Sequence, residues 1–429
     1  MYKFTKLSNG LPVIISPMRG TKTATVLFIV GTGSKYENKI NSGISHFVEH
    51  MMFKGTKKRP NSMAITTELD AIGSENNAFT DKENTGYYVK AESDQIEIAL
   101  DVLSDMIMNS KFDAKEIKKE KGVITKELNM YLDNPIMYIE DLFETCLYGN
   151  TPAGWDIVGT KKTIANFKRT DFIKYWKTQY GTKSSLLCVA GNTKTDIIKL
   201  VNKYFGRMTS NNFNDKIGVV EKQEKPEIKL HYKQTDQAHL SLGVRSYRHD
   251  CKDKIVLKVL ASILGGSMSS RMFSELREKR GLAYYVKTFN QTYTDTSYLT
   301  TQAGVPIDKI NEAIKIILGE YSKLISTGKK NRNVNTKELN RVKEFLIGRF
   351  ALQSEPSDAM ANWYGRQGIL NIQTGQPIMT PEKYYSEVKK VTIKDILRVA
   401  KDIFTNQKLN LAIIGPYKNR AKFEKILSL

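Results

Sequence analysis

Two of the chain's five histidines, His46 and His50, stand four residues apart in the segment HFVEH, with Glu49 between them. At about 100° per residue on a helix, the imidazoles lie about 40° apart and Glu49 projects within about 90° of them. Two such imidazoles can bind one zinc ion and leave room for another protein ligand and a water. Zinc lowers the pKa of a bound water, and an adjacent carboxylate can accept its proton during attack on a carbonyl. The segment therefore predicts a hydrolytic metal site with Glu49 as general base.

The alternative is that His46 and His50 are ordinary neighbours on a helix surface. With five histidines among 429 residues, about 0.06 pairs at this spacing are expected by chance, and requiring the glutamate lowers the expectation to about 0.004. The order His-x-x-Glu-His is the inverse of the common zinc-protease motif and is a known signature in its own right. Chance is therefore a poor explanation.

A third ligand is expected from another element. The segment FDAKEIKKEKGVITKELNMYLD has helical spacing, and its Glu120 and Glu127 are seven residues apart, so they share a face. One of them could bind the metal directly, while the other orients a ligand or the bound water from outside the coordination sphere. Without the histidine motif, both would be interpreted as solvated helix charges.

The elements that must position these residues alternate between two periods. Residues 4–30 predict strands, residues 42–53 and 62–73 have helical spacing, residues 76–92 return to a strand pattern, and residues 94–110 predict an amphipathic helix. This mixture predicts an α+β fold in which helices pack on a largely antiparallel sheet.

An internal repeat predicts two such domains. TKSSLLCVAGNTKTDIIKLVNKYFGRM and NQKLNLAIIGPYKNRAKFEKILSL share a strand, a glycine turn and a helix, with Gly191 and Gly415 in equivalent places. The segment between the two copies is polar and is typical of a linker. We expect a catalytic metal-binding domain at residues 1–210, a linker at 211–226 and a similar non-catalytic, substrate-binding domain at 227–429.

Composition argues for a folded protein with a diffusely basic surface. Lys+Arg 66 against Asp+Glu 45 gives a net charge of +21, but the lysines are spread through helix faces and turns. No basic motif interleaved with aromatic residues is present, so we expect no nucleic-acid partner. Salt-sensitive binding to some polyanion stays open.

Cysteine usage and the terminal sequence suggest a compartment. Cys146, Cys188 and Cys251 are odd in number and far apart, which favours a reducing environment. No signal-peptide pattern begins the sequence and no apolar run approaches the roughly 20 residues that span a bilayer. We therefore expect a soluble, cytoplasmic protein without a membrane partner.

Over essentially its whole length, the sequence resembles the pitrilysin-type zinc metallopeptidases. The resemblance is to a short-chain branch similar to the catalytic subunit of mitochondrial processing peptidase and its bacterial relatives. It rests on HFVEHMMFKGT, on NNAFTDKENTGYYV and on a glutamate 77 positions after the second histidine (127 − 50). It implies His46, His50 and Glu127 as ligands of one zinc per chain, Glu49 as general base and Glu120 as a supporting catalytic carboxylate.

The same resemblance implies substrate-binding residues. The strand that holds Asn77 and Ala78 would offer its edge to a peptide, whereas the sequence alone favours a polar turn entering a strand. In SMSSRMFSELREKRGLAYYV, Arg277 and Tyr284 would bind substrate and the oxyanion; otherwise they are a surface arginine and a packed tyrosine. In long family members this pair comes from the opposite half of a clamshell, so a chain of this length implies one half and a dimer.

Together these features predict a zinc endopeptidase that hydrolyses unstructured peptides or oligopeptides inside a closed dimeric chamber. The partner is expected to be a second copy, although a heterodimer with a related inactive chain occurs in the family that the sequence resembles. The alternative is a non-catalytic structural or partner subunit with the same fold. The sequence does not choose between peptide scavenging and maturation of a particular precursor.

Overall fold

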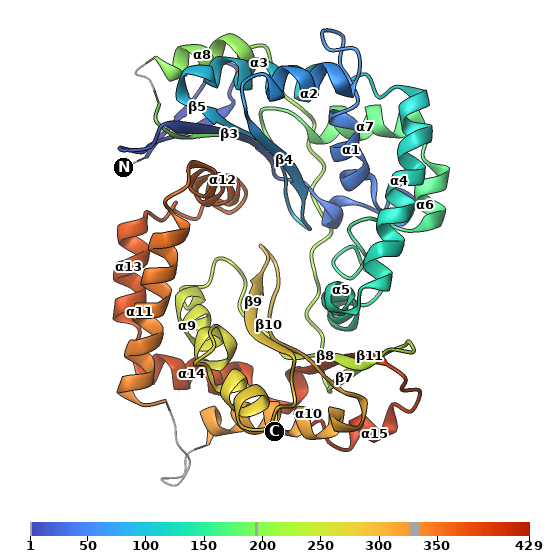
Figure 1. The fold of residues 1–429 in the computed structure, drawn as a ribbon, viewed down its shortest axis with the longest axis vertical. Helices are drawn as coiled ribbons and strands as arrows, with labels where there is room; N and C mark the ends of the chain where they lie inside the picture. The colour runs from blue at the N-terminus through green and yellow to red at the C-terminus, as the bar shows by residue number, and fades with distance from the viewer. Residues whose placement is uncertain (1, 194–195, 327–333) are drawn as a thin grey trace. The chain divides into compact units, whose positions relative to one another are not determined.

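The computed structural model of the chain describes residues 2–193, 196–326 and 334–429 (Figure 1). These residues form two compact units, each assembled from three segments. Unit 1 comprises Met1–Asn129, Trp155–Ile217 and Ala351–Thr380. Unit 2 comprises Met130–Gly154, Gly218–Phe350 and Pro381–Leu429.

The sheet of unit 1 has six strands in the order β1-β2-β6-β3-β5-β4. Neighbours are antiparallel except for the parallel pair β2 and β6. The strands are β1 Lys3–Lys6, β2 Pro12–Pro17, β3 Thr23–Val30, β4 Glu75–Thr80, β5 Thr85–Glu92 and β6 Ser185–Gly191. The edge strand β4 pairs with β5 alone among the described residues.

Helices cover the sheet of unit 1 on both faces, as the alternating side chains of β3 show. Leu27 and Ile29 lie in the cluster formed with α12, whereas Phe28 stacks on Phe205 of α8 at 5.7 Å between ring centroids. Both faces of this strand are thus buried, which explains its nearly continuous apolar sequence. The helices of this unit are α1 Ile44–Met52, α2 Ser62–Asp70, α3 Ile96–Asn109, most of α4 Ala114–Asp133, α6 Lys161–Asn166, α7 Arg169–Gln179, α8 Ile197–Phe205 and α12 Ser357–Thr374.

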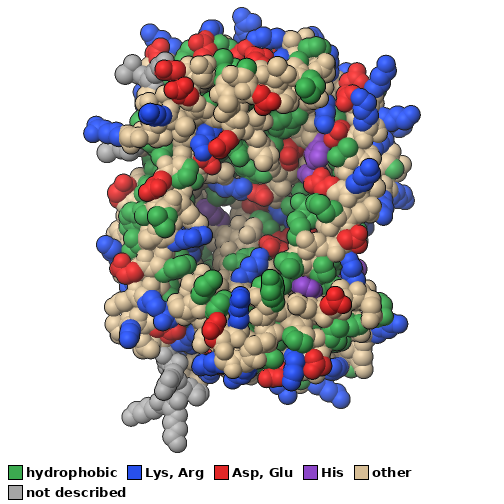
Figure 2. All heavy atoms as spheres, viewed as in Figure 1, with side chains coloured by type: hydrophobic (Ala, Val, Ile, Leu, Met, Phe, Trp, Pro, Cys, Tyr) green, Lys and Arg blue, Asp and Glu red, His purple; other side chains and the backbone are tan. Residues whose placement is uncertain are grey.

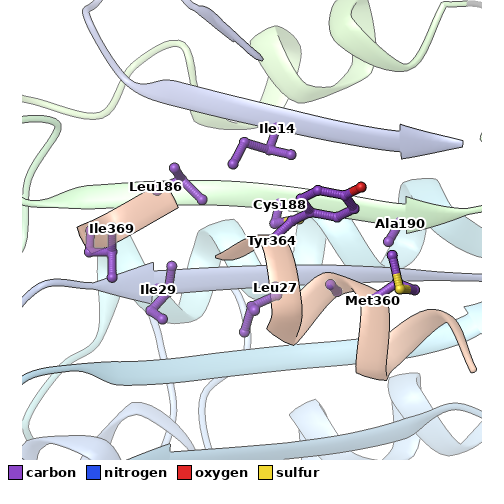
Figure 3. Close-up of a cluster of buried hydrophobic side chains, with 10 residues drawn as sticks. Ile14, Leu27, Ile29, Leu186, Cys188, Ala190, Met360, Tyr364 and Ile369 are labelled. Carbon is purple, nitrogen blue, oxygen red and sulfur yellow. The ribbon is translucent and has the colours of Figure 1, made fainter. Parts of the chain in front are cut away.

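The α12 helix contributes to the core of unit 1 although it comes late in the chain. Its Met360, Tyr364 and Ile369 point at β2, β3 and β6 (Figure 3). The hydroxyl of Ser357, at the start of α12, also lies 2.8 Å from that of Thr25 on β3. Apolar packing and a buried polar contact therefore both fix this helix on the sheet.

Unit 2 repeats the same topology. Its five-stranded sheet has the order β7-β11-β8-β10-β9, which corresponds strand for strand to β2-β6-β3-β5-β4, and again only the first pair is parallel. Gly191 and Gly415 end the equivalent strands β6 and β11. The strands are β7 Glu227–Tyr232, β8 Gln237–Arg245, β9 Tyr285–Thr292, β10 Ser297–Pro306 and β11 Leu409–Gly415.

The helices of unit 2 pack around this second sheet. Phe143 of α5 contacts Tyr298 of β10 with ring centroids 5.3 Å apart, and other α5 residues pack against Ala412 and Ile414 of β11. The helices are α5 Pro135–Tyr148, α9 Lys254–Gly265, α10 Ile310–Ile325, α11 Thr336–Gln353, α13 Pro381–Lys390, α14 Ile393–Ile403 and α15 Ala421–Glu424. Three residues at the C-terminal end of α11 belong to unit 1.

The predicted fold class, two similar α+β domains with largely antiparallel sheets, is confirmed. The predicted domain boundaries stay a prediction. The compact units are not continuous in sequence, because α5 from the first half of the chain packs in unit 2 and α12 from the second half packs in unit 1. Between α8 and β7 the chain forms no helix or strand.

Two further features concern the surface and the cysteines. On the face shown in Figure 2, lysine and arginine side chains are scattered and do not form one stripe. Cys146, Cys188 and Cys251 are free. Within the described ranges, no helix combines the length and apolar character needed to cross a bilayer.

Candidate metal centre

Helix α1 carries His46, Glu49 and His50, and a buried carboxylate fixes where the helix starts. The carboxylate of Glu37 accepts hydrogen bonds from the backbone N–H of Gly43 at 2.7 Å and of Ser45 at 2.8 Å. An acceptor at this place satisfies N–H groups that have no partner within the helix, and its position favours negative charge. Gly43 itself has φ 93°, a left-handed conformation that suits glycine.

The structure brings His46, His50 and Glu127 together from α1 and α4. His46 Nε2 lies 3.5 Å from Glu127 Oε1, and His50 Nε2 lies 3.4 Å from Glu127 Oε2. One ligand atom from each residue falls within 4.8 Å of the others. Two imidazole nitrogens and one carboxylate oxygen, converging on one point, suit a tetrahedral zinc site with an open fourth position. The residues present therefore fit the predicted ion.

Contacts between imidazoles and carboxylates in this cluster shift the pKa values of His50 and Glu127. Burial would lower the pKa of His50, but hydrogen bonds to Glu120 and Glu127 outweigh it and raise the pKa to about 9. Hydrogen bonds from His46 and His50 hold the pKa of Glu127 well below its usual range. A metal ion would take the place of the shared protons, so metal binding and proton release are coupled here.

Glu120 lies behind His50. Its Oε2 is 3.1 Å from His50 Nδ1, and its Oε1 is 2.7 Å from Lys54 Nζ. Burial would raise the pKa of Glu120, but these two contacts lower it. From this place a carboxylate can orient the His50 imidazole, and the supporting catalytic role of Glu120 stays a prediction.

Glu49 is next to the metal centre and is held by one side chain of the sheet. Thr80 Oγ1, at the end of β4, donates a 2.6 Å hydrogen bond to Glu49 Oε2. Burial raises the pKa of Glu49, and the Thr80 hydrogen bond and the two histidines reduce that rise. A raised pKa makes a carboxylate a stronger acceptor for the proton that a general base must take up.

Asn77 and Ala78 lie in the edge strand β4. The whole segment Glu75–Thr80 is strand, so the interpretation of ENNAFT as a turn is wrong. That interpretation weighed the polar composition and could not see the pairing with β5. Asn77 Oδ1 accepts a 2.8 Å hydrogen bond from the Ala78 N–H.

Arg277 and Tyr284 are in unit 2. Arg277 is in a π-helical turn, Phe273–Glu278, a conformation often found at functional sites. Its guanidinium lies over the Phe273 ring, 5.1 Å from the centroid, and Nη1 donates to the Tyr284 carbonyl at 3.1 Å. The Tyr284 side chain projects outward and the residue is 74 % exposed. The tyrosine is thus not packed, and both residues' role toward substrate stays a prediction.

Sequence reasoning missed Lys54, Thr80 and Glu37. A signal existed for two of them: Lys54 follows His50 by four residues, the helical spacing that places it near the same face, and Thr80 follows Ala78 by two, which places both on one face of a strand. Glu37 precedes α1 in a loop, where no periodicity applies.

Convergent histidines and a carboxylate, with a second carboxylate beside them, are side chains that metal-dependent hydrolases combine. Two family models match the chain: "Insulinase (Peptidase family M16)" over residues 13–161 and "Peptidase M16 inactive domain" over residues 166–346. An uncharacterised zinc protease of Bacillus subtilis is 34 % identical over 98 % of this chain and 99 % of its own length. The chain belongs to the M16 family of peptidases.

Solved structures agree with the fold. A protease from Helicobacter pylori superimposes with a TM-score of 0.87 at 22 % identity, covering 96 % of this chain and 99 % of its own. A chain of complex III2 from Candida albicans superimposes with a TM-score of 0.81 at 15 % identity, covering 100 % of both chains. Similarities at this level of identity establish the fold alone.

Proposed function

We propose that the protein is a zinc metalloendopeptidase acting on unstructured peptides. The observation that carries the proposal is the convergence of His46, His50 and Glu127, with Glu49 held beside them by Thr80. The M16 relatives named as zinc proteases support the choice of ion and of reaction. The single cluster of suitable ligands among the described residues supports a stoichiometry of one zinc per chain.

The side chains divide the work of peptide hydrolysis. When bound at this centre, zinc supplies Lewis-acid polarisation of the scissile carbonyl and acidification of the attacking water. Glu49 Oε1, the oxygen not bonded to Thr80, accepts the proton of that water and returns it to the leaving amine. His46, His50 and Glu127 would hold the ion, and Glu120 keeps the His50 ring in place.

The edge of β4 supplies a docking place for the substrate backbone. An extended peptide can add to this edge, along Asn77 and Ala78, through main-chain hydrogen bonds. Such binding selects extended chains and is tolerant of side-chain identity. We further propose that Arg277 and Tyr284 bind the substrate in a dimeric enclosure formed with a second copy or a related chain.

The test is hydrolysis of a mixed peptide library, read by mass spectrometry, with and without a zinc chelator. Chelation should abolish cleavage and added zinc should restore it. Glu49→Gln should lower kcat by about 10²–10⁴ while the variant still binds zinc. Cleavage that survives either the chelator or Glu49→Gln excludes the mechanism.

A second candidate function is that of a non-catalytic subunit. The observation in its favour is the fold shared with a chain of complex III2. Against it, the three donor residues and Glu49 are all in place. Metal analysis of the purified protein separates the two candidates. A stoichiometry near one zinc per chain supports the peptidase, and less than about a tenth supports the subunit.

A further inference from the structure

Lys54 is not among the predicted ligands, yet it shares the carboxylate that holds His50. Glu120 Oε1 lies 2.7 Å from Lys54 Nζ, and Glu120 Oε2 lies 3.1 Å from His50 Nδ1. The Glu120 side chain is 6 % exposed and that of Lys54 is 24 % exposed. Each oxygen of one buried carboxylate thus contacts a different nitrogen.

Two contacts on opposite oxygens restrict how the carboxylate can turn. The terminal torsion of a glutamate is soft, with a broad energy minimum, so one hydrogen bond leaves the plane of the carboxylate poorly defined. Charge-assisted bonds to Lys54 and His50 together define that plane. The hydrogen bond at Nδ1 in turn sets the tautomer and orientation of His50, directing Nε2 toward Glu127.

The backbone around Lys54 is built to keep this contact. Gly55 has φ 115°, and a Cβ at this position would lie 2.7 Å from the Pro60 carbonyl oxygen. Thr56 Oγ1 donates a 2.5 Å hydrogen bond to buried Asp105 on α3. The turn that follows Lys54 is therefore fixed by a close backbone approach on one side and by a buried hydrogen bond on the other. In the segment HFVEHMMFKGT, the final Lys-Gly-Thr thus supplies the ammonium group and the two residues that fix the turn after it.

His46 has no equivalent support. Its Nδ1 is buried, and no hydrogen-bond partner for it occurs among the described residues. Beyond the contact of its Nε2 with Glu127, only packing holds that ring. The hydrogen bonds that orient the imidazole pair from the Nδ1 side therefore run through His50, Glu120 and Lys54.

We propose that Lys54 is a positioning residue of the metal centre, which strengthens metal binding by holding Glu120 and, through it, His50. The inference rests on the proposed zinc site and adds a residue to it. It predicts a loss of metal affinity on removal of the ammonium group.

Zinc affinity, measured by competition with a colorimetric chelator, tests the proposal. Lys54→Met should weaken zinc binding about 10–100-fold, the range seen when partners outside the coordination sphere are removed. Lys54→Arg keeps the charge and should stay within about threefold of the parent protein. Lys119→Met is the matched control. Lys119 is an exposed residue of α4 that pairs with Glu116, 2.5 Å away on the same helix, so its loss should leave zinc affinity unchanged.

A double substitution tests the route of the effect. If Lys54 acts through Glu120, Lys54→Met should add no loss of affinity to that of Glu120→Gln. An equal loss in both backgrounds overturns this route. The Glu120→Gln background also serves if Lys54→Met alone does not fold, because it removes the buried carboxylate that would be left unpaired. Circular dichroism of each zinc-free variant checks folding.

The outcomes separate this inference from the proposed function. Tight zinc binding by the parent protein and by Lys54→Met alike overturns the role of Lys54 and leaves the peptidase proposal standing. A parent protein that binds no zinc overturns both.

Discussion

Thr80 donates a 2.6 Å hydrogen bond to Glu49, so the end of strand β4 and the middle of helix α1 meet at the predicted general base. Thr80 follows Ala78 by two residues, and alternate side chains of a strand share a face. The strand expected to bind the substrate backbone is therefore tied, through one hydroxyl, to the carboxylate expected to act on it. This contact connects substrate position with base position.

Removing that hydroxyl should impair the base without harming the metal site. Thr80→Val should lower kcat about tenfold, the effect of losing one hydrogen bond to a charged group, and leave zinc affinity unchanged. Thr80→Ser keeps the hydroxyl and should keep most activity. Since the hydrogen bond lowers the pKa of Glu49 against the effect of burial, its loss should raise that pKa. The acid limb of the kcat profile should then move to higher pH, because the base must be ionised. Equal loss of activity in the Ser and Val variants would contradict this role.

Two glycines offer a matched test of how α1 is placed. Gly43 has φ 93°, and a Cβ there would lie 2.4 Å from the Val158 carbonyl oxygen, so Gly43→Ala should destabilise the fold by about 2–4 kcal/mol. At Gly122, an exposed position of α4, a Cβ would meet no other atom within 4 Å, so Gly122→Ala should stabilise the fold by about 0.5–1 kcal/mol. Thermal unfolding of the zinc-free proteins compares them. Similar shifts in both variants would show that the start of α1 is not constrained.

Glu37 predicts a pH dependence of stability. Burial raises its pKa from 4.5 to about 7, against hydrogen bonds from Ser45 and Gly43 that lower it. The folded protein therefore holds this proton more tightly than the unfolded chain, and the stability it contributes falls as pH rises from about 4.5 through 7. Glu37→Gln removes the titration. The stability of the parent protein relative to this variant should thus drop by about 1–3 kcal/mol between pH 5 and pH 8.

Denaturant unfolding at several pH values measures that difference. A relative stability that rises with pH would mean that the start of α1 favours the ionised carboxylate more strongly than burial opposes it. The sign of the slope therefore decides between desolvation and the attraction of the helix N-terminus.

Arg277 predicts a loss of catalysis at constant metal content. Its guanidinium is held over Phe273 and by the Tyr284 carbonyl, so it is preorganised to donate its remaining N–H groups. Arg277→Ala should lower kcat/KM about 10²-fold with zinc affinity unchanged. The control is Lys279→Ala in the same segment, where Lys279 pairs with Glu275. Equal activity of the two variants would remove Arg277 from the substrate site.

Local patterns in the sequence were enough to predict the elements and the chemistry of the site. Strand and helix periods, together with the repeat in which Gly191 and Gly415 occupy equivalent places, were sufficient to predict two α+β domains. Alternation and helical spacing are local properties of the chain. Two histidines one helical turn apart define a metal-binding face for the same reason. Helical spacing left Glu120 and Glu127 both open as the third ligand, and Glu127 was assigned by the resemblance to a family with a glutamate 77 positions after the second histidine.

Spacing could place Lys54 and Thr80 on a helix face and a strand face, but the partners that each contacts could be identified only in the folded chain. Lys54 and Thr80 reach Glu120 and Glu49 because a fixed turn and an edge strand end beside α1. The placement of α12 on the first sheet, and of α5 on the second, also has no local signal. The sequence of an amphipathic helix indicates only that one of its faces is buried. Any apolar sheet face of suitable shape can cover that helix face. Packing across the whole chain therefore decides which sheet the helix covers.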